Sequence, residues 1–393
     1  ILDWQTPVFG EIVLIAGMVS GILGVVYALG QHDIKRLLAY HSVENIGIIL
    51  IGIGIGMIGT ALNNPLMAVL GFTGGILHVL NHSIFKSLLF MGAGMVLHQT
   101  GTRSIDALGG LVKKMRITGT TFIIGSLAIS GLPPFNGFVS EFLVYVGAFK
   151  GVPLGSLSFI MSLFAIIGLA IIGGLALACF TKVVGVVFQG EPRTPAAENK
   201  EEKGFTMLVS MGVLAAACLV IGVFPQYFIY ASSAAVSALN LGYGQIPAEP
   251  FWEFAGNITF ASILFIIAVI IVSVVRSFFY RNKSITSSGT WGCGFTRPTA
   301  KMQYTGSSYA GDILAFFSAA APLSEEHPPI RGRFPDKTHY HSHVSDIAEQ
   351  QLDRVIVRPV LFLFDKLRWI QHGDIHLYIG YILLAIALLL FFI

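Results

Sequence analysis

Eight long apolar segments constrain this chain more than any other feature of its sequence. They cover approximately residues 9–30, 43–60, 66–98, 117–150, 156–184, 206–230, 256–279 and 375–393. A helix needs about 20 apolar residues to cross the hydrocarbon core of a bilayer. Only 11% of the chain is charged, whereas soluble domains are roughly 25% charged. We therefore predict an all-α integral membrane protein with about eight transmembrane helices.

The third and fourth segments are too long for a simple crossing. A helix over residues 66–98 would extend about 50 Å against a hydrocarbon core of about 30 Å, so it is expected to tilt, protrude or break. The fourth segment contains "SGLPPFNGF" (130–138), whose paired prolines remove backbone donors and clash with the preceding turn. Non-helical backbone at membrane depth is tolerated only inside protein or beside a water-filled cavity. This segment predicts a broken helix of the kind found in transporters.

Basic residues are distributed unequally between the two sides of the predicted helices. Lys150 falls in a loop on one side and Lys86 lies within a segment, whereas every other Lys and Arg falls toward the opposite side. Cytoplasmic loops carry such an excess of Lys and Arg. We expect the basic loops to be cytoplasmic and both chain ends to be outside. The formal net charge of +3 is too small to suggest nucleic-acid binding.

The C-terminal part of the chain has a different composition. Residues 280–352 are predicted to form a polar cytoplasmic loop, followed by an amphipathic helix over 353–372 and a last transmembrane helix over 373–393. In the amphipathic segment, charged residues share one face: Arg354, Arg358, Asp365 and Arg368. Such a helix lies at a membrane surface or against neighbouring subunits, and Pro359 is expected to bend it.

Three proton-binding side chains occur in the third apolar segment. His78, His82 and Lys86 are spaced four and four, so they lie on one face of a helix. Ionisable groups are rare at bilayer depth unless they pair or serve a pathway. Single buried histidines are often satisfied core residues and lysines often snorkel, but three in register favour a proton relay that passes through water.

Carboxylates near this segment are further candidates. Glu141 follows the predicted break, where it serves either as an ion-pair partner that fixes the helix or as a proton-accepting gate. Glu44 begins the second segment, near His41, and is a candidate partner for Lys35 at the cytoplasmic mouth of a proton path. Lys35 and Arg36 are alternatively simple positive-inside anchors.

Other kinds of site receive little support from the sequence. Two histidines at positions i and i+4 cannot both be axial ligands of one haem, and the alternating His339, His341 and His343 lack nearby metal-ligating partners. Cys179, Cys218 and Cys293 show no metal-ligand spacing and are interpreted as packing residues. Nucleotide loops and nucleophile triads are also missing. The sequence therefore predicts no cofactor, no metal and no catalytic centre within the chain.

Three motifs together resemble a known family. "QHDIKRLLAYHSVENIGII", "HVLNHSIFKSLLFMGAG" and "GLPPFNGFVSEF" are similar to motifs of the antiporter-like proton-translocating subunits of respiratory complex I, Mrp antiporters and group 4 membrane-bound hydrogenases. Within that family, "AYHSVENIG" and "TWGCGFTRPTAKMQYTGSSYA" (290–310) resemble the large membrane subunit of hydrogenase-4 and formate hydrogenlyase complexes.

The resemblance implies both architecture and function. Residues 1–184 would form the second of the family's two five-helix repeats and 185–279 two further helices, with the chain being the C-terminal portion of a longer subunit. Lys35 would match the lysine after the repeat's first helix, His78, His82 and Lys86 the relay, and Glu141 the terminal group on the broken helix. The implied function is proton translocation in a prokaryotic inner-membrane hydrogenase or complex I-like assembly, driven by redox chemistry in other subunits. An Mrp-type Na⁺/H⁺ antiporter subunit and a non-pumping hydrogenase anchor remain alternatives.

Overall fold

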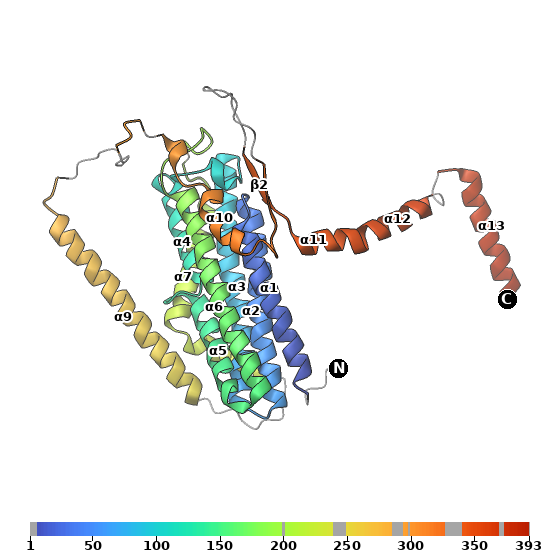
Figure 1. Ribbon diagram of the computed structural model, residues 1–393, viewed down its shortest axis with the longest axis horizontal. Coiled ribbons are helices and arrows are strands. Elements are labelled where there is room, and N and C mark those ends of the chain that lie inside the picture. Colours follow the sequence, from blue (N-terminus) through green and yellow to red (C-terminus); the bar gives the residue numbers. More distant parts are fainter. Residues whose placement is uncertain are drawn as a thin grey trace. The chain divides into compact units, whose positions relative to one another are not determined.

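The computed structural model describes residues 6–198, 201–238, 249–284, 294–297, 299–326, 340–368 and 373–392. The chain divides into two compact units, Ile1–Val344 and Ser345–Ile393. The larger unit contains a bundle of helices that run side by side (Figure 1). Its long helices are α1 (Val8–Leu29), α2 (Ile34–Ala61), α3 (Pro65–Thr100), α4 (Arg116–Ile129), α5 (Asn136–Gly151), α6 (Ser156–Val183), α7 (Phe205–Val223), α8 (Gln226–Ser237) and α9 (Glu249–Tyr280).

Shorter elements complete the larger unit. They are 3-10 turns at Ile105–Ala107, Leu111–Lys113, Val152–Leu154 and Ala300–Met302, a π turn at Val184–Phe188, helix α10 (Gly306–Phe316), and strands β1 (Leu323–Glu326) and β2 (His341–Val344). The smaller unit consists of α11 (Ile347–Leu352), a π turn (Asp353–Val357), α12 (Arg358–Leu367) and α13 (Ile375–Phe392).

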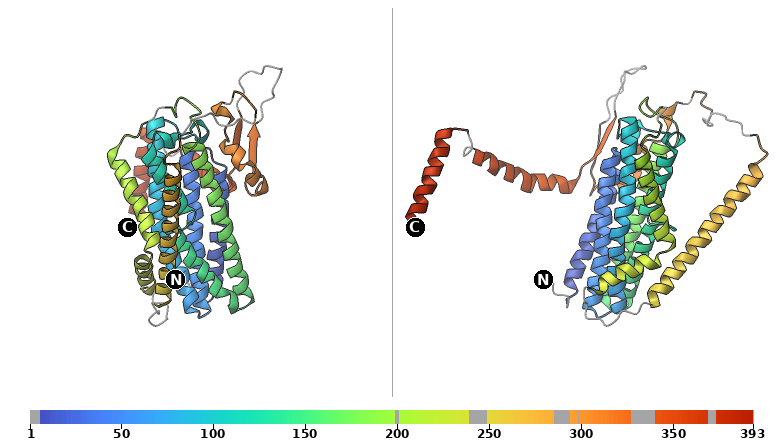
Figure 2. Two further views of the ribbon diagram at one scale, coloured as in Figure 1. Left: turned by 90° about the vertical axis from the view of Figure 1, so that its left-hand side faces the viewer. Right: turned by 180° about the vertical axis from the view of Figure 1, so that it is seen from behind.

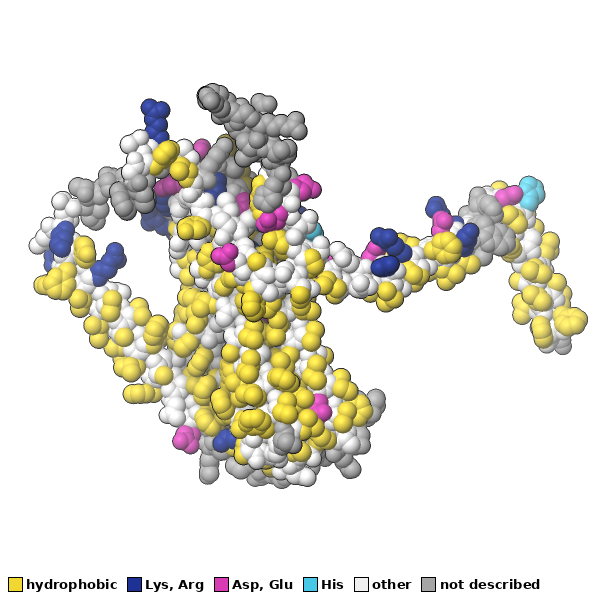
Figure 3. Space-filling view, viewed as in Figure 1, with side chains coloured by type: hydrophobic (Ala, Val, Ile, Leu, Met, Phe, Trp, Pro, Cys, Tyr) yellow, Lys and Arg dark blue, Asp and Glu magenta, His cyan; other side chains and the backbone are white. Residues whose placement is uncertain are grey.

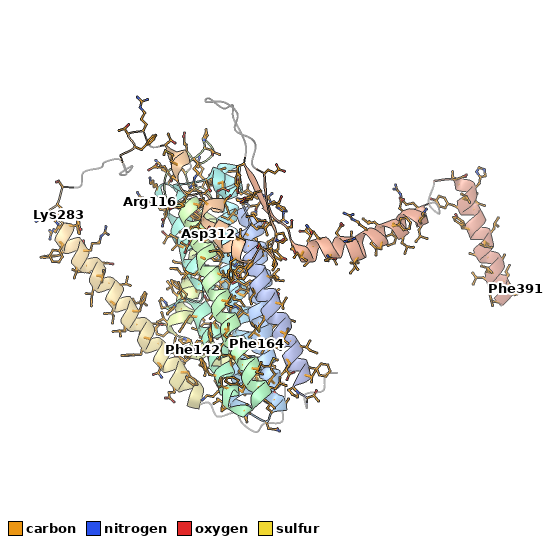
Figure 4. All side chains as sticks on the ribbon, in the orientation of Figure 1. Arg116, Phe142, Phe164, Lys283, Asp312 and Phe391 are labelled. Carbon is orange, nitrogen blue, oxygen red and sulfur yellow. The ribbon has the colours of Figure 1, made fainter. Side chains whose placement is uncertain are left out.

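The predicted number of membrane-crossing segments is confirmed. Eight of the described helical segments are long and apolar enough to span a bilayer. On the face shown in Figure 3, hydrophobic side chains cover the middle of the bundle and charged side chains lie mainly toward its ends. Figure 4 labels Arg116 and Asp312 toward one end of the bundle, and Phe142 and Phe164 in the half that leads to the other end.

The predicted break in the fourth segment is also confirmed. Helix α4 ends at Ile129, and α5 begins at Asn136. Between them, Gly131 has a φ of 64°, in the left-handed region that favours glycine. The long third segment, which could have tilted, protruded or broken, forms one uninterrupted helix of 36 residues, α3.

Two helix boundaries differ from the sequence prediction. The second segment was expected to begin at residue 43, but α2 begins at Ile34 because the Asp33 side chain accepts hydrogen bonds from the amides of Lys35 and Arg36 and caps the helix. The sixth was expected to continue to residue 230, but α7 ends at Val223 and Pro225 precedes α8. The change in α2 places Lys35, His41 and Glu44 within one helix.

Helices α1 and α2 approach each other through glycines. A Cβ atom added to Gly47 would lie 2.4 Å from the backbone nitrogen of Gly21 and 2.5 Å from the carbonyl oxygen of Gly17. Small residues of this kind let helix backbones pack closely within a membrane. Gly24 lies equally close to the backbone of Glu44, so the polar part of α2 is held directly against α1.

The segment predicted as a polar loop, 280–352, has more structure than expected. β1 and β2 pair antiparallel, with Leu323 opposite Val344, and Figure 2 shows α10 and the strands at one end of the bundle. Val344 and Leu314 are buried, and the Tyr27 hydroxyl donates to the Ala320 carbonyl at 3.1 Å. Apolar side chains in this segment therefore pack onto the end of α1, which its polar composition concealed.

The smaller unit agrees with the helical prediction for residues 353 onward. Pro359 lies in the first turn of α12, immediately after the π turn. Trp369, which the prediction placed on the amphipathic helix, lies outside the described residues, as do His339 and Cys293. The predicted division into 1–184, 185–279, 280–352, 353–372 and 373–393 stays a prediction.

Candidate functional site

Three polar side chains are buried on α2. His41, Glu44 and Asn45 have 0% exposure, and their spacing places them within one turn and on one side of the helix. Nδ1 of His41 is hydrogen-bonded to Oε2 of Glu44. His41 Nε2 and Glu44 Oε1 have no hydrogen-bond partner among the described residues, so this pair retains capacity to bind water or a proton.

The relay predicted on α3 is located inside the bundle. His78 and Lys86 are buried, and His82 is partly buried. The ammonium group of Lys86 donates a hydrogen bond to the Leu38 carbonyl on α2, one turn before His41. The ring of Phe85 lies near both histidines, with its centroid 6.1 Å from that of His78 and 5.7 Å from that of His82.

His78 connects α2 to the broken helix. Its Nδ1 lies 2.9 Å from the Ser140 hydroxyl of α5, and its Nε2 lies 3.1 Å from Oδ1 of Asn45. The amide nitrogen of Asn45 donates to the His41 carbonyl at 2.7 Å, which orients Oδ1 toward His78. Hydrogen bonds thus extend from α5 through α3 to the polar turn of α2.

The contacts of His78 are compatible with two protonation states. An imidazolium carries two N–H donors, whereas a neutral imidazole carries one. Both neighbours of His78 can accept, because the Ser140 hydroxyl is turned toward the Gly137 carbonyl at 3.1 Å. If His78 keeps only its Nε2 proton, the Ser140 hydroxyl can rotate and donate to Nδ1. One hydroxyl rotation therefore satisfies either state.

Two asparagines hold the broken helix against α3. Nδ2 of Asn81 donates to the Asn136 carbonyl at 2.7 Å and to the Ser140 hydroxyl at 2.9 Å, and Asn136 donates back to the Asn81 side chain at 3.3 Å. These bonds fix the first turn of α5 to α3, whereas the side-chain Oδ1 of Asn136 has no partner among the described residues.

Glu141 lies where the break was expected to place it. It is 8% exposed, and its carboxylate is packed against Gly131, the residue at which the chain turns between α4 and α5. Among the described residues, no hydrogen bond or ion pair of the Glu141 side chain is found, so the ion-pair alternative receives no support from the described contacts.

The predicted pairing of Glu44 with Lys35 is wrong. Glu44 is bonded to His41, and Lys35 lies nine residues earlier, about 13 Å along α2. Lys35 is half-buried near the start of the helix. The structure thus brings Glu44, Lys86 and His78 into the same part of the bundle, and leaves Lys35 at its end.

Lys182, one of the basic residues assigned to the cytoplasmic side, is buried near the end of α6. It is 1% exposed, and its ammonium group donates to the carbonyls of Leu29 at 2.6 Å and Gln31 at 3.0 Å. Both carbonyls belong to the C-terminal end of α1, where cations are favourable. Asn45, Asn81 and Ser140 were also missed, although amide side chains within apolar segments were a visible signal.

The end of the bundle near Lys35 carries its own ion pairs. His32 Nδ1 lies 2.7 Å from Asp106, and Asp33 lies 3.0 Å from Arg103. Burial alone would raise the pKa of Asp106, but hydrogen bonds from His32 and from the Gly306 amide outweigh that effect and hold the pKa below its usual value.

Comparisons with known proteins agree with this architecture. Residues 2–168 match the family described as "NADH:quinone oxidoreductase/Mrp antiporter, TM". The chain is 31% identical to hydrogenase-4 component B of Escherichia coli (strain K12) over 97% of this chain and 58% of that protein. It is 37% identical to formate hydrogenlyase subunit 3 of the same organism over 84% of this chain and 53% of that protein. The chain therefore spans about half the length of these curated relatives.

A solved structure has a fold similar to that of this chain. A chain of the membrane-bound sulfane sulfur reductase, an archaeal respiratory membrane complex, is 22% identical, with a TM-score of 0.61 over 98% of this chain and 56% of that chain. The helix bundle, its broken helix and the comparisons lead to one conclusion: over residues 2–168 this integral membrane chain matches the family described as "NADH:quinone oxidoreductase/Mrp antiporter, TM".

Proposed function

We propose that this chain is a proton-translocating, non-catalytic membrane subunit of a hydrogenase-type or complex I-like assembly, in which other subunits perform the redox chemistry. The observation that carries the proposal is the hydrogen-bonded series Ser140–His78–Asn45, which links the first turns of α5 to the backbone carbonyl of His41, the residue whose side chain is bonded to Glu44. Groups that exchange protons, inside a bundle of apolar helices, are expected to mark an ion path.

In this proposal, protons move between the α2 turn and the broken helix. Lys86, His82 and His78 lie one turn apart on α3, and transfer between them occurs through water that enters the bundle. Rotation of the Ser140 hydroxyl allows His78 to gain or lose a proton without leaving a buried nitrogen unsatisfied. Glu141, beside the break, receives the proton and releases it to the opposite side. Neighbouring subunits drive the cycle by changing the hydration of Lys86 and Glu141.

We further propose that the end of the bundle that carries Lys35, Arg103 and Lys113 faces the cytoplasm. Basic residues concentrate on the cytoplasmic side of membrane proteins. Lys35, at this end, is a candidate for the cytoplasmic mouth of the path. In the described residues, the ion pairs of His32 and Asp33 lie at the same end. The amphipathic residues around α12 would then lie at a membrane surface or against a neighbouring subunit.

The test uses inside-out vesicles that contain the complete assembly with the full-length subunit. Redox turnover and acidification of the vesicle interior are measured together for the wild type, Lys86→Met and Glu141→Gln. We expect both variants to lose most of the acidification per turnover. Lys114→Met is the matched control, because Lys114 is exposed outside the membrane spans, and it should behave as the wild type.

Two outcomes would overturn the proposal. Unchanged acidification per turnover in both variants would favour a non-pumping anchor. Acidification that requires Na⁺ and proceeds without redox turnover would favour the alternative of a Na⁺/H⁺ antiporter subunit. The requirement for Na⁺ is measured by replacing Na⁺ with K⁺ in the same vesicles.

A further inference from the structure

A series of hydrogen-bonded side chains lies at the end of the bundle that carries Lys35. Its centre is His32, in the turn between α1 and α2: Nδ1 lies 2.7 Å from Oδ2 of Asp106, and Nε2 lies 2.8 Å from the Ser342 hydroxyl of β2. The Ser342 hydroxyl lies 3.2 Å from that of Ser307, at the start of α10. Segments far apart in the sequence therefore meet at one imidazole.

The outer part of the series reaches solvent. The Tyr340 hydroxyl donates to Oε1 of Glu325 at 2.8 Å and is also close to the hydroxyls of Ser307 and Ser342. Tyr340 is 45% exposed, and Glu325 is exposed. Because a hydroxyl both donates and accepts hydrogen bonds, these side chains connect His32 to a carboxylate in contact with water. We refer to the following residues as the His32 cluster: His32, Asp106, Ser307, Glu325, Tyr340 and Ser342.

The hydrogen bonds of the cluster define the tautomer of His32. Asp106 accepts from the Gly306 amide at 2.7 Å as well as from His32, and these bonds hold the pKa of Asp106 below its usual value, so the carboxyl group is ionised at neutral pH. An ionised carboxylate only accepts hydrogen bonds, and Nδ1 of His32 therefore carries a proton. In the neutral ring, Nε2 accepts from the Ser342 hydroxyl and can take up a proton from that direction.

The space beside the cluster suits water better than a substrate. The series Asp106–His32–Ser342 has the order of a serine hydrolase triad. However, the cavity that His32, Ser307 and Ser342 line has a volume of about 10 Å³, and a cavity of about 10–15 Å³ holds one water molecule. The cluster can therefore exchange protons with water, whereas an ester or a peptide does not fit.

Lys182, near the end of α6, adjoins the cluster from inside the bundle. Its ammonium group donates to the carbonyl of Gln31, the residue before His32, and it is close enough to Asp106 for electrostatic attraction. An ammonium group has three N–H donors and a neutral amine has two, so the carbonyls of Leu29 and Gln31 keep their hydrogen bonds in both states. Lys182 can therefore bind or release a proton without leaving a buried carbonyl unsatisfied.

Helix α6 continues the connection toward the polar turn of α2. Cys179, one turn before Lys182 and on the same side of α6, lies close to both Lys182 and His41. The ring of Phe180 has its centroid 4.6 Å from that of His41. Lys182 is thus near the His32 cluster on one side and near the buried His41–Glu44 pair on the other.

We propose that the His32 cluster is the site at which this chain takes up protons from the cytoplasm. The proposal rests on the proposed function and deepens it, because it places the mouth of the path at His32 instead of Lys35.

Uptake conserves protons at each step. The hydroxyl proton of Ser342 moves to Nε2 of His32, and Ser342 regains a proton from the Tyr340 hydroxyl or from water, so one proton leaves the solvent for each imidazolium formed. Asp106 is a positioning residue that fixes the ring and stabilises the imidazolium. The imidazolium then releases a proton through water to the neutral amine of Lys182.

His32 is expected to dominate the pH dependence of uptake. Within the described residues, hydrogen bonds of its ring go only to Asp106 and Ser342. Other charged or titratable groups that surround it are Asp33, Arg103, Lys182, Arg193, Glu325 and Tyr340.

The test measures transport in the inside-out vesicles described above, whose outer surface is the cytoplasmic face. His32→Gln retains a side chain that hydrogen-bonds but cannot carry a proton, and Ser342→Ala removes the connection to solvent. We expect both variants to slow redox turnover and acidification together, several-fold at an external pH of about 8 and much less at about 6, where protons are more abundant. Ser342→Thr, which retains the hydroxyl, should follow the wild type.

Two controls separate proton uptake from attachment of the segment that contains α10, β1 and β2. Tyr27→Phe removes the hydrogen bond to the Ala320 carbonyl, which also attaches this segment, and leaves the His32 cluster intact. Ser324→Ala changes an exposed hydroxyl of β1 outside the cluster. Both variants should show the pH dependence of the wild type, and thermal unfolding of every variant measures any loss of stability.

The proposal fails on any of four results. The first is wild-type rates in His32→Gln and Ser342→Ala at every pH while Lys86→Met loses acidification, which would reject this uptake site but not the proposed function. The second is equal slowing in Tyr27→Phe, which would show that the cluster only attaches the segment. The third is pH-dependent slowing in Lys35→Met and not in His32→Gln, which would place the mouth at Lys35. The fourth is a wild type that does not acidify the vesicles, which would reject the proposed function as well.

Discussion

The carboxylate of Glu141 lies directly against Gly131, so that a Cβ atom at Gly131 would be 2.4 Å from Oε2 of Glu141. The same glycine has a φ of 64°. The position therefore requires glycine for two reasons, the backbone conformation and the space for a buried acidic group.

Gly131→Ala is expected to disturb Glu141 more than the fold. The left-handed conformation costs a residue with a Cβ about 1–2 kcal/mol, and the added methyl must displace the carboxylate. We expect a lower unfolding midpoint and a marked loss of acidification per turnover in vesicles. Gly174→Ala, at an open position of α6, should change neither, and normal transport by Gly131→Ala would show that the carboxylate position is unimportant.

Ser140→Ala tests the hydroxyl that contacts both His78 and Asn81. Loss of a buried hydrogen-bonding partner costs about 1–3 kcal/mol, and here two neighbours lose it. Chemical or thermal unfolding in detergent measures the stability, and vesicle acidification measures the function. Ser210→Ala is the control, since that exposed hydroxyl bonds only to its own helix, and its effect should remain within about 0.5 kcal/mol.

A double-mutant cycle can test the buried His41–Glu44 pair. Leaving a buried hydrogen-bonding group without its partner destabilises a protein by about 1–3 kcal/mol. Glu44→Gln and His41→Gln should each be strongly destabilising, and the double variant should cost much less than their sum, because neither group is left alone. Additive losses of unfolding free energy would mean that the two side chains do not interact.

The Asp106 carboxyl predicts a dependence of stability on pH. Its pKa is lower in the folded protein than in the unfolded chain: burial opposes this shift, but hydrogen bonds from His32 and Gly306 outweigh burial. Its stabilising contribution is therefore fully present above the unfolded pKa of about 4 and is lost as the pH falls through the lower folded pKa. The unfolding midpoint of Asp106→Asn should fall less than that of the wild type below about pH 4, and parallel curves would contradict this.

The local features of the site were predictable from the sequence because they follow from spacing. The intervals between His78, His82 and Lys86 specify one helix face, and the paired prolines specify a break before Glu141. The contact of His78 with Ser140, 62 residues later, and with Asn45, 33 residues earlier, depends on how three helices pack. A hydropathy pattern contains no information about that packing.

Capping and burial explain the remaining differences from the prediction. Helix α2 starts about two turns before the predicted residue because the Asp33 side chain accepts hydrogen bonds from amides at the helix start that have no helical partner. Lys182 was counted only as a basic residue of the cytoplasmic side, but carbonyls at and just after the end of α1 satisfy its ammonium group inside the bundle. Each effect depends on two hydrogen bonds of one side chain, which composition does not reveal.

The glycine contact between α1 and α2 determines where the bundle is stiff. The backbones of α1 and α2 touch at Gly17, Gly21 and Gly47, so the two helices cannot slide past each other without steric overlap. His41 and Glu44 therefore lie on a helix whose position is fixed. The interrupted helix is also packed closely against α3, because a Cβ atom at Gly74 would lie 3.1 Å from the Ser140 carbonyl oxygen, and Asn81 and Asn136 add hydrogen bonds between the two helices. Ser140 and His78 are therefore held at a fixed separation, and rotation of the Ser140 hydroxyl is the movement that this packing leaves open.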